Sequence, residues 1–173
     1  MKKNIVLIGF MGCGKTTVGR RAAAALGLDF YDTDEFLEKS EKMSVSQIIA
    51  KKGRRYFEGA QQFAVMNLCE NEGCLISTGG NTVADGRNRE MLKKNGLLIW
   101  LKASAETVYR NTRASHNRRP ELAGATVEDI AAMLAEHEPE YSDCDITVNV
   151  DGRDMEQIVS KVLEEIKKNT GIG

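Results

Sequence analysis

A glycine-rich segment near the N-terminus ends in a lysine and a threonine whose spacing is typical of loops that bind nucleotide phosphates. It runs from Gly9 to Thr16 and reads Gly-Phe-Met-Gly-Cys-Gly-Lys-Thr. Glycines let the backbone curl until successive N–H groups point at phosphates, and a following helix adds the positive end of its dipole. The lysine would neutralise charge on the β- and γ-phosphates, while the threonine hydroxyl would bind Mg²⁺. The segment therefore predicts an ATP site made of Gly12, Cys13, Gly14, Lys15, Thr16 and Thr17.

Two carboxylates, Asp32 and Asp34, follow the second apolar run of the chain. In an open α/β sheet the ends of adjacent strands face one crevice, so we expect both to lie across from the phosphate loop. Asp32 could orient a water on Mg²⁺, and Asp34 could accept a proton from an attacking hydroxyl. The same residues are also typical of a helix N-cap, which would be a purely structural role. Both interpretations stay open at this point.

Two further features could complete a transfer site. Gly79 and Gly80 follow the third apolar run, where paired glycines let backbone amides approach an acceptor closely. The segment 113–124 is rich in arginine and has little apolar periodicity, which predicts a lid over the triphosphate. We assign Arg113 to nucleotide binding and Arg119 to catalysis, with a solvated charged surface as the alternative.

These residues need a scaffold, and the apolar pattern predicts an α/β fold. Short apolar runs alternate with longer helical patterns, which favours βαβ units and a mostly parallel sheet. A helix is expected from Lys15 to Leu26, ended by Gly27 in a left-handed conformation, and an amphipathic helix from Met155 to Lys168. The expected strands cover residues 5–8, 28–31, 73–77, 97–101 and 145–150.

The predicted organisation is one kinase domain over residues 1–173. Helical residues 35–70, broken near 40–44 and at Gly53, form an insertion that could wall an acceptor pocket. The lid is expected at 113–124. The core of the domain is expected to comprise residues 4–34, 73–112 and 143–168.

Composition limits the partners of the chain. With 173 residues and a formal net charge of -1, we expect neither a nucleic-acid surface nor a membrane surface. The N-terminal apolar run is too short for a signal peptide or a membrane span, and the four cysteines form no CxxC pair. The expectation is a cytoplasmic, reduced protein, a monomer, that acts on a small hydroxylated molecule.

Together these residues resemble the shikimate kinase family over about Asn4 to Tyr141. The resemblance implies a P-loop NTPase three-layer sandwich, similar to nucleoside monophosphate kinases, in which helices flank a five-stranded parallel sheet with an acceptor-binding insertion and a lid. It also implies ATP, Mg²⁺ and conversion of shikimate to shikimate 3-phosphate in aromatic amino-acid biosynthesis. The resemblance rests on Gly9 to Lys15, Thr17 to Arg20, Leu26-Gly27, Phe30, Asp32-Thr33-Asp34, Gly79-Gly80 and Arg119-Pro120.

The same resemblance implies a role for each matching residue. Lys15 and Thr16 would contact phosphate and metal, with Asp32 on the metal side. Asp34 would contact the acceptor hydroxyl and act as its base. Gly79 and Gly80 would supply acceptor-side backbone, and Arg119 would be the arginine of the lid.

Three positions depart from the family pattern where the substrate carboxylate is held, and Asn81 and Glu121 depart from it in the turn after the third apolar run and in the lid. Glu58 and His137 stand where shikimate kinases place arginines that hold the substrate carboxylate, and Gln61 replaces an acid one turn after Glu58. A glutamate cannot reproduce a bidentate arginine–carboxylate clamp, although Arg54 and Arg55 lie close enough in sequence to compensate. If Glu58 and His137 bind the acceptor, they favour a neutral polyol or an amino alcohol. A diverged kinase for such a compound, or an ATP-binding regulator without an acceptor, therefore stays as an alternative.

Overall fold

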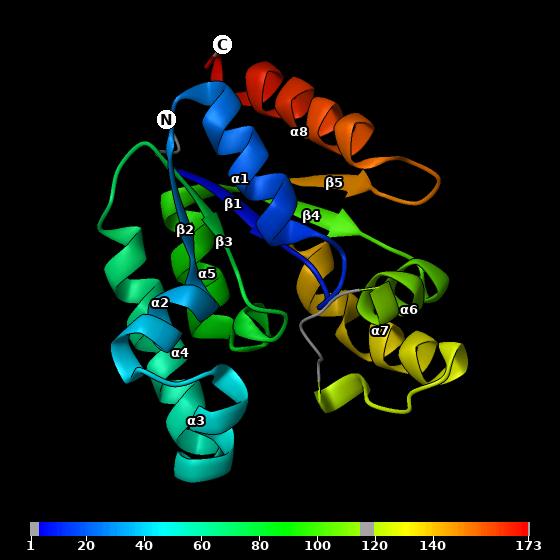
Figure 1. Ribbon diagram of the computed structural model, residues 1–173. Helices are drawn as coiled ribbons and strands as arrows, with labels where there is room; N and C mark the ends of the chain where they lie inside the picture. The colour runs from blue at the N-terminus through cyan, green and yellow to red at the C-terminus, as the bar shows by residue number, and fades with distance from the viewer. Residues whose placement is uncertain (1–3, 115–119, 173) are drawn as a thin grey trace.

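Five short apolar segments pair into one parallel sheet in the computed structural model, which describes residues 4–114 and 120–172 (Figure 1). All four strand pairings are parallel, in the order β2-β3-β1-β4-β5. The central strand is buried along its whole length, as expected for a run that is apolar on both faces. The strands are β1 (Asn4–Ile8), β2 (Asp29–Asp32), β3 (Cys74–Ser77), β4 (Gly96–Lys102) and β5 (Ile146–Asn149).

Helices cover both faces of this sheet, which confirms the predicted three-layer architecture. In Figure 1, α1 and α8 pack together along one face, and α5 lies on the other. The helices are α1 (Lys15–Leu26), α2 (Thr33–Glu41), α3 (Val45–Lys52), α4 (Arg54–Cys69), α5 (Gly86–Asn95), α6 (Ala105–Ala114), α7 (Val127–Ser142) and α8 (Met155–Thr170), with 3-10 turns η1 (Thr82–Ala84) and η2 (Pro120–Leu122).

The ends of the helices follow local signals in the sequence. Gly27 adopts the left-handed conformation predicted for the end of α1, with φ of 65°. Asp154 accepts a hydrogen bond from Gln157 N at the start of α8, and the Gln157 side chain accepts one back from Asp154 N. The predicted apolar side of α8 is buried, as Ile158, Val162 and Ile166 show.

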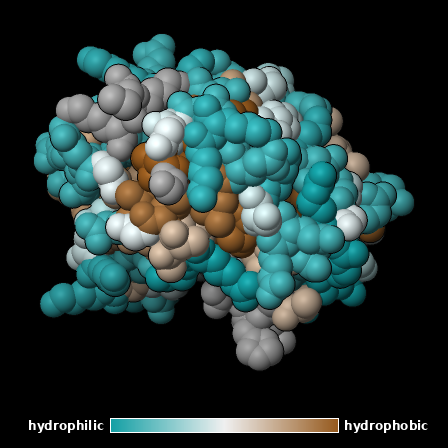
Figure 2. Space-filling view, turned by 90° about the horizontal axis from the view of Figure 1, so that it is seen from above, coloured by the Kyte–Doolittle hydropathy of each residue, from teal (hydrophilic) through white to brown (hydrophobic). Residues whose placement is uncertain are grey.

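Seen from above, polar side chains cover most of the surface, and hydrophobic ones gather in one place (Figure 2).

The insertion between β2 and β3 consists of α2, α3 and α4, and it has a small core of its own. Leu37, Ile48, Phe57 and Ala64 form this core, separate from the larger cluster around the sheet. The helical structure is interrupted between α2 and α3, where Lys42 has a left-handed backbone conformation, and again at Gly53, where φ is 85°. The structure therefore has helix breaks where they were predicted.

The expected lid differs from the structure at its start. Helix α6 continues through Ala114, so Arg113 is helical, whereas a loop was predicted from residue 113 onward. The guanidinium of Arg113 lies 4.3 Å from the centre of the Tyr109 ring, one turn earlier, and this cation–π contact extends the helix. Arg119, the arginine assigned to catalysis, lies outside the described residues.

No helix in the described part of the chain is long and apolar enough to cross a membrane.

Reduced thiols account for all four cysteines, as predicted. Cys74 is buried at the start of β3, and Cys69 is partly buried at the end of α4. Burial raises the pKa of both thiols to about 11. Because the thiolate is the reactive form, neither side chain is suited to redox chemistry at neutral pH.

Candidate active site

The glycine-rich loop connects the central strand β1 to helix α1, and its glycines are required by the packing around it. Gly12 has φ of 80°, and a Cβ atom there would lie 2.7 Å from Thr112 Cγ2 on α6. A Cβ on Gly9 would lie 2.7 Å from the carbonyl oxygen of Leu101. The amide of Asn111 donates a hydrogen bond to the carbonyl of Gly12 at 2.9 Å, which fixes the loop from α6. The loop is therefore a preformed cradle with its backbone close to neighbouring strands and helices.

Lys15 lies inside this cradle, with its charge directed at the loop itself. The side chain is buried, and its Nζ donates to the carbonyl oxygens of Gly9 at 2.7 Å and Phe10 at 2.9 Å. The same nitrogen lies 3.7 Å from the sulfur of Cys13, which is also buried. Lys15 is thus a cation positioned at the bend of the loop. Because the thiol of Cys13 is buried, a ligand would contact the backbone of this residue more readily than its side chain.

Thr16 and Asp32 come together across the ends of β1 and β2. The Thr16 hydroxyl donates to Asp32 Oδ2 at 2.9 Å. The other carboxylate oxygen of Asp32 accepts hydrogen bonds from the backbone N–H groups of Asp34 and Glu35. Asp32 therefore caps α2, as one interpretation of the sequence predicted, and it also presents a hard oxygen beside a second one on Thr16. Such an oxygen pair fits Mg²⁺, which prefers carboxylate, hydroxyl, water and phosphate ligands.

Asp34 is packed directly against the glycine turn that follows β3. A Cβ atom on Gly79 would lie only 2.4 Å from Asp34 Oδ1. The backbone N–H of Gly79 donates to the hydroxyl of Thr33 at 2.8 Å, which ties the turn to the start of α2. The structure therefore brings Asp34 and Gly79 together, as the parallel sheet predicted.

Tyr141 supports the same turn, and the sequence analysis did not assign it to the site. Its hydroxyl donates a hydrogen bond to the carbonyl of Gly80, and its ring stacks on Trp100 with centroids 5.9 Å apart. Burial raises the pKa of Tyr141 well above its usual value, so the hydroxyl remains a donor. Gly80 in turn lies against Met11, because a Cβ on Gly80 would be 3.1 Å from Met11 N. A tyrosine two residues after Pro139 was the only signal in the sequence.

The three departing positions fall in different surroundings. The ring of His137 lies beside the phosphate loop, with its centroid 6.3 Å from that of Phe10, and its Nδ1 is 3.7 Å from Glu140 Oε2. Gln61 is buried and donates to the Thr82 hydroxyl at 3.4 Å, which joins α4 to η1. Glu58 is exposed on α4. Gln61 thus links two elements of the fold, and His137 lies beside the phosphate loop.

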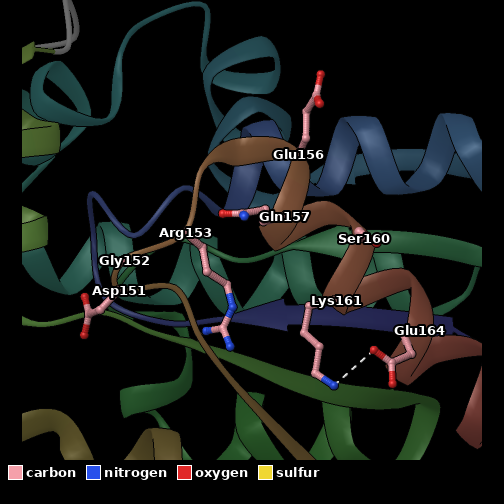
Figure 3. Close-up of a pocket in the computed structure, with 8 residues that line it drawn as sticks. All are labelled: Asp151, Gly152, Arg153, Glu156, Gln157, Ser160, Lys161 and Glu164. Atoms are coloured by element: carbon pink, nitrogen blue, oxygen red, sulfur yellow. Dashed lines mark hydrogen bonds and ion pairs between the residues drawn. The ribbon is translucent and has the colours of Figure 1, made fainter.

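The opposite side of the phosphate loop is formed by the loop between β5 and α8. A Cβ on Gly14 would lie 3.9 Å from Cε of Met155, the first residue of α8. Although burial alone would raise it, hydrogen bonds from Ser104 N and the Thr107 hydroxyl hold the pKa of Asp151 below its usual value, and they anchor this loop. Figure 3 shows the adjoining depression, of ≈ 720 Å³, lined by Asp151, Gly152, Arg153, Glu156, Gln157, Ser160, Lys161 and Glu164.

The sheet order thereby gives the crevice two ends. Asp34 and Gly79 follow β2 and β3 on one side of the phosphate loop, whereas Asp151 follows β5 on the other. Ligands of open α/β sheets bind at such strand ends. The site can accept a phosphate chain at the centre and a hydroxylated molecule on the Asp34 side. Arg113, assigned to the nucleotide, is exposed on α6 beside Tyr109.

The contact between Gly79 and Asp34 makes a specific prediction. Gly79→Ala places a methyl group 2.4 Å from the carboxylate, so Asp34 must move. A misplaced catalytic group commonly costs about 100-fold in rate, and we expect a loss of that order in kcat. Steady-state kinetics would measure it. Gly86→Ala is the matched control, because its Cβ would meet no atom closer than 3.8 Å, and equal losses in both variants would contradict the prediction.

Comparison with known proteins agrees with this geometry. The family model described as shikimate kinase matches residues 11–167. The chain is 40% identical over 173 residues to a shikimate kinase of Caldanaerobacter subterraneus, covering 98% of this chain and 99% of the relative. It is 37% identical to that of Moorella thermoacetica, with 96% of each chain covered.

Solved structures give the same result. A shikimate kinase of Acinetobacter baumannii in complex with shikimate is similar with a TM-score of 0.89, at 29% identity over 97% of this chain and 94% of that one. The shikimate kinase of Aquifex aeolicus is similar with a TM-score of 0.82, at 31% identity over 98% and 99%.

Proposed function

Because this chain belongs to the shikimate kinase family, we propose that it transfers the γ-phosphoryl group of ATP to a ring hydroxyl of shikimate and forms shikimate 3-phosphate. The observation that carries the proposal is the placement of Asp34 against Gly79, across the strand ends from Lys15. Full-length similarity to shikimate kinases favours this acceptor over a polyol, an amino alcohol or a regulatory role without transfer.

The donor half of the site would hold the triphosphate through the loop backbone. Lys15 would exchange its hydrogen bonds to Gly9 and Phe10 for contacts to phosphate oxygens, which neutralises charge as it develops in the transition state. Thr16 and Asp32 would hold Mg²⁺, which supplies further charge neutralisation when it is bound. The purine would extend toward the β5–α8 loop, because Asp34 and Gly79, on the other side of the phosphate loop, are assigned to the acceptor. Arg113 and Arg119 stay assigned to nucleotide binding and to catalysis.

The acceptor half would activate and orient one hydroxyl. The carboxylate of Asp34 would accept the proton of that hydroxyl while the hydroxyl oxygen forms a bond to the γ-phosphorus. The bond between that phosphorus and the bridging oxygen breaks, and ADP leaves. The backbone of Gly79 and Gly80, held by Thr33 and Tyr141, would keep the acceptor in line with the phosphate loop.

Glu58 and His137 stay assigned to the acceptor. His137 is well placed for this role, because it lies beside Phe10 at the edge of the phosphate loop and is partly exposed. A ring N–H of this imidazole would donate a hydrogen bond to the carboxylate of shikimate. Glu58, on the exposed side of α4, would contact a hydroxyl of the ring through hydrogen bonds rather than through charge.

An assay with ATP, Mg²⁺ and a panel of acceptors tests the function directly. We expect saturable ADP release with shikimate, and little or none with polyols, sugars and amino alcohols that lack its carboxylate. Nucleotide binding by calorimetry is measured on the same sample. Turnover of a neutral or amino-bearing acceptor in preference to shikimate would overturn the assignment, as would tight ATP binding without turnover of any acceptor.

A further inference from the structure

The peptide bond between Gly12 and Cys13 lies in the middle of the phosphate loop, and its orientation is held from outside the loop. The carbonyl oxygen of Gly12 accepts a hydrogen bond from the side-chain amide of Asn111 at 2.9 Å. Asn111 lies on α6, 99 positions later in the chain, and is partly buried. Figure 1 shows this helix beside the segment that links β1 to α1. The loop therefore has a support that its own residues do not supply.

The N–H group of Cys13 points the opposite way, into the loop. The C=O and N–H bonds of a trans peptide point in opposite directions, and the peptide bonds of the described residues are all trans. Because the carbonyl of Gly12 faces α6, the N–H of Cys13 faces the carbonyl oxygen of Phe10, at 3.3 Å. Lys15 Nζ donates to the same oxygen at 2.9 Å. Two donors thus converge on one point inside the loop, where an anionic phosphate oxygen could accept from both.

Gly12 itself does not prevent this peptide from rotating. Its φ is 80°, and a residue without a Cβ tolerates a wide range of backbone conformations. Rotation of the peptide plane would turn the carbonyl of Gly12 into the loop, where it would repel a phosphate, and would remove the N–H of Cys13 from the ligand. The net stabilisation from one hydrogen bond is enough to shift such a two-state equilibrium by about tenfold. The bond from Asn111 therefore favours the orientation that can bind an anion.

Helix α6 is held at a fixed distance from the loop. A Cβ atom on Gly12 would lie 2.7 Å from Cγ2 of Thr112, so the helix and the loop are in direct contact. The hydroxyl of Thr112 donates to the carbonyl of Val108 at 2.8 Å, which orients this side chain. Before the first turn of α6, the N–H of Ser104 donates to the carboxylate of Asp151 at 3.0 Å. The helix is thus anchored at its start and packed against the loop near its end.

We propose that Asn111 is a positioning residue for the phosphate chain of the nucleotide. By holding the carbonyl of Gly12 outward, it keeps the N–H of Cys13 available to a phosphate oxygen. In this role the amide of Asn111 contacts the loop and not the ligand. The inference rests on the proposed nucleotide site, but it does not depend on the identity of the acceptor. It assigns part of the affinity for the nucleotide to a residue outside the glycine-rich segment.

Calorimetric titration of the full chain with Mg²⁺-ADP tests the proposal. Asn111→Leu is similar in size but has no donor, so we expect the Kd for ADP to rise by about tenfold. The KM for shikimate at saturating ATP should stay within about twofold of wild type, a split that general destabilisation would not produce. Asn111→Gln keeps an amide donor and should retain most of the affinity. Asn169→Leu is the control, because it removes an amide-to-carbonyl bond of 2.8 Å at the exposed end of α8.

The orientation of the peptide has its own spectroscopic test. In ¹H–¹⁵N spectra of the wild type, the amide proton of Cys13 should move downfield when ADP is added, because its acceptor changes from a carbonyl to an anionic oxygen. In Asn111→Leu at saturating ADP this movement should be much smaller.

The outcomes separate this inference from the proposed function. Unchanged ADP affinity in a folded Asn111→Leu variant would overturn the inference, as would a full shift of the Cys13 amide in that variant. So would an equal loss of affinity in Asn111→Gln or in Asn169→Leu. A wild-type protein that binds no ADP would instead overturn the proposed function. Thermal denaturation checks folding, and Asn111→Ser, whose hydroxyl is too short to reach the same carbonyl, serves if the leucine variant fails to fold.

Discussion

Asp34→Asn is expected to lower kcat for phosphoryl transfer to shikimate by about 10²- to 10⁴-fold, the usual contribution of a general base. The amide is nearly isosteric with the carboxylate, so it still fits against Gly79, but it cannot take the proton of the acceptor hydroxyl. ATP affinity should stay within about threefold of wild type, because Asp34 lies on the acceptor side of the phosphate loop. Steady-state kinetics and calorimetric ATP titration measure the two quantities on one preparation.

Asp29→Asn is the matched control for this substitution. Asp29 is an exposed aspartate at the opposite end of β2, so the same change in chemistry is made away from the site. We expect it to leave kcat unchanged. Equal kcat for Asp34→Asn and wild type would remove Asp34 from the role of base. A parallel loss of ATP affinity would instead assign it to the donor half of the site.

Lys15→Met is expected to reduce kcat/KM for ATP by about 10³-fold or more, since Lys15 would supply charge stabilisation in a water-poor site. Methionine has a similar length and can fill the buried space, so the loop loses a cation without gaining a cavity. The substitution also leaves the carbonyl oxygens of Gly9 and Phe10 without their present donor in the ligand-free protein. We therefore expect a lower free energy of unfolding by about 1–3 kcal/mol as well.

The two effects of Lys15→Met can be separated. Kinetics with saturating shikimate measures the catalytic loss, and urea denaturation without nucleotide measures the change in stability. Lys167→Met, on the exposed side of α8, is the control for removal of one positive charge. Near-normal kcat/KM for Lys15→Met, in a variant shown to be folded, would contradict the role of this lysine.

Much of the donor half was predictable because its signals are local. The loop from Gly9 to Thr16 carries its chemistry in consecutive residues, and the apolar run before it and the helix after it fix its setting. The same holds for the five strands, the left-handed Gly27 and the breaks at 42–44 and Gly53, since each depends on neighbours within a few residues. The expected loop from residue 113 failed because a cation–π contact extends α6.

The acceptor half depended on contacts between distant segments, which only the tertiary structure decided. The sheet order sets Gly79 against Asp34, and the packing of α7 carries Tyr141 to Gly80 and His137 to Phe10. Which side of α4 is exposed to solvent likewise followed only from the tertiary structure. Composition and spacing determined which chemistry this chain can perform. Which side chains share a site depends on long-range packing, because a hydrogen bond or a van der Waals contact has no signature in the residues that lie between its partners.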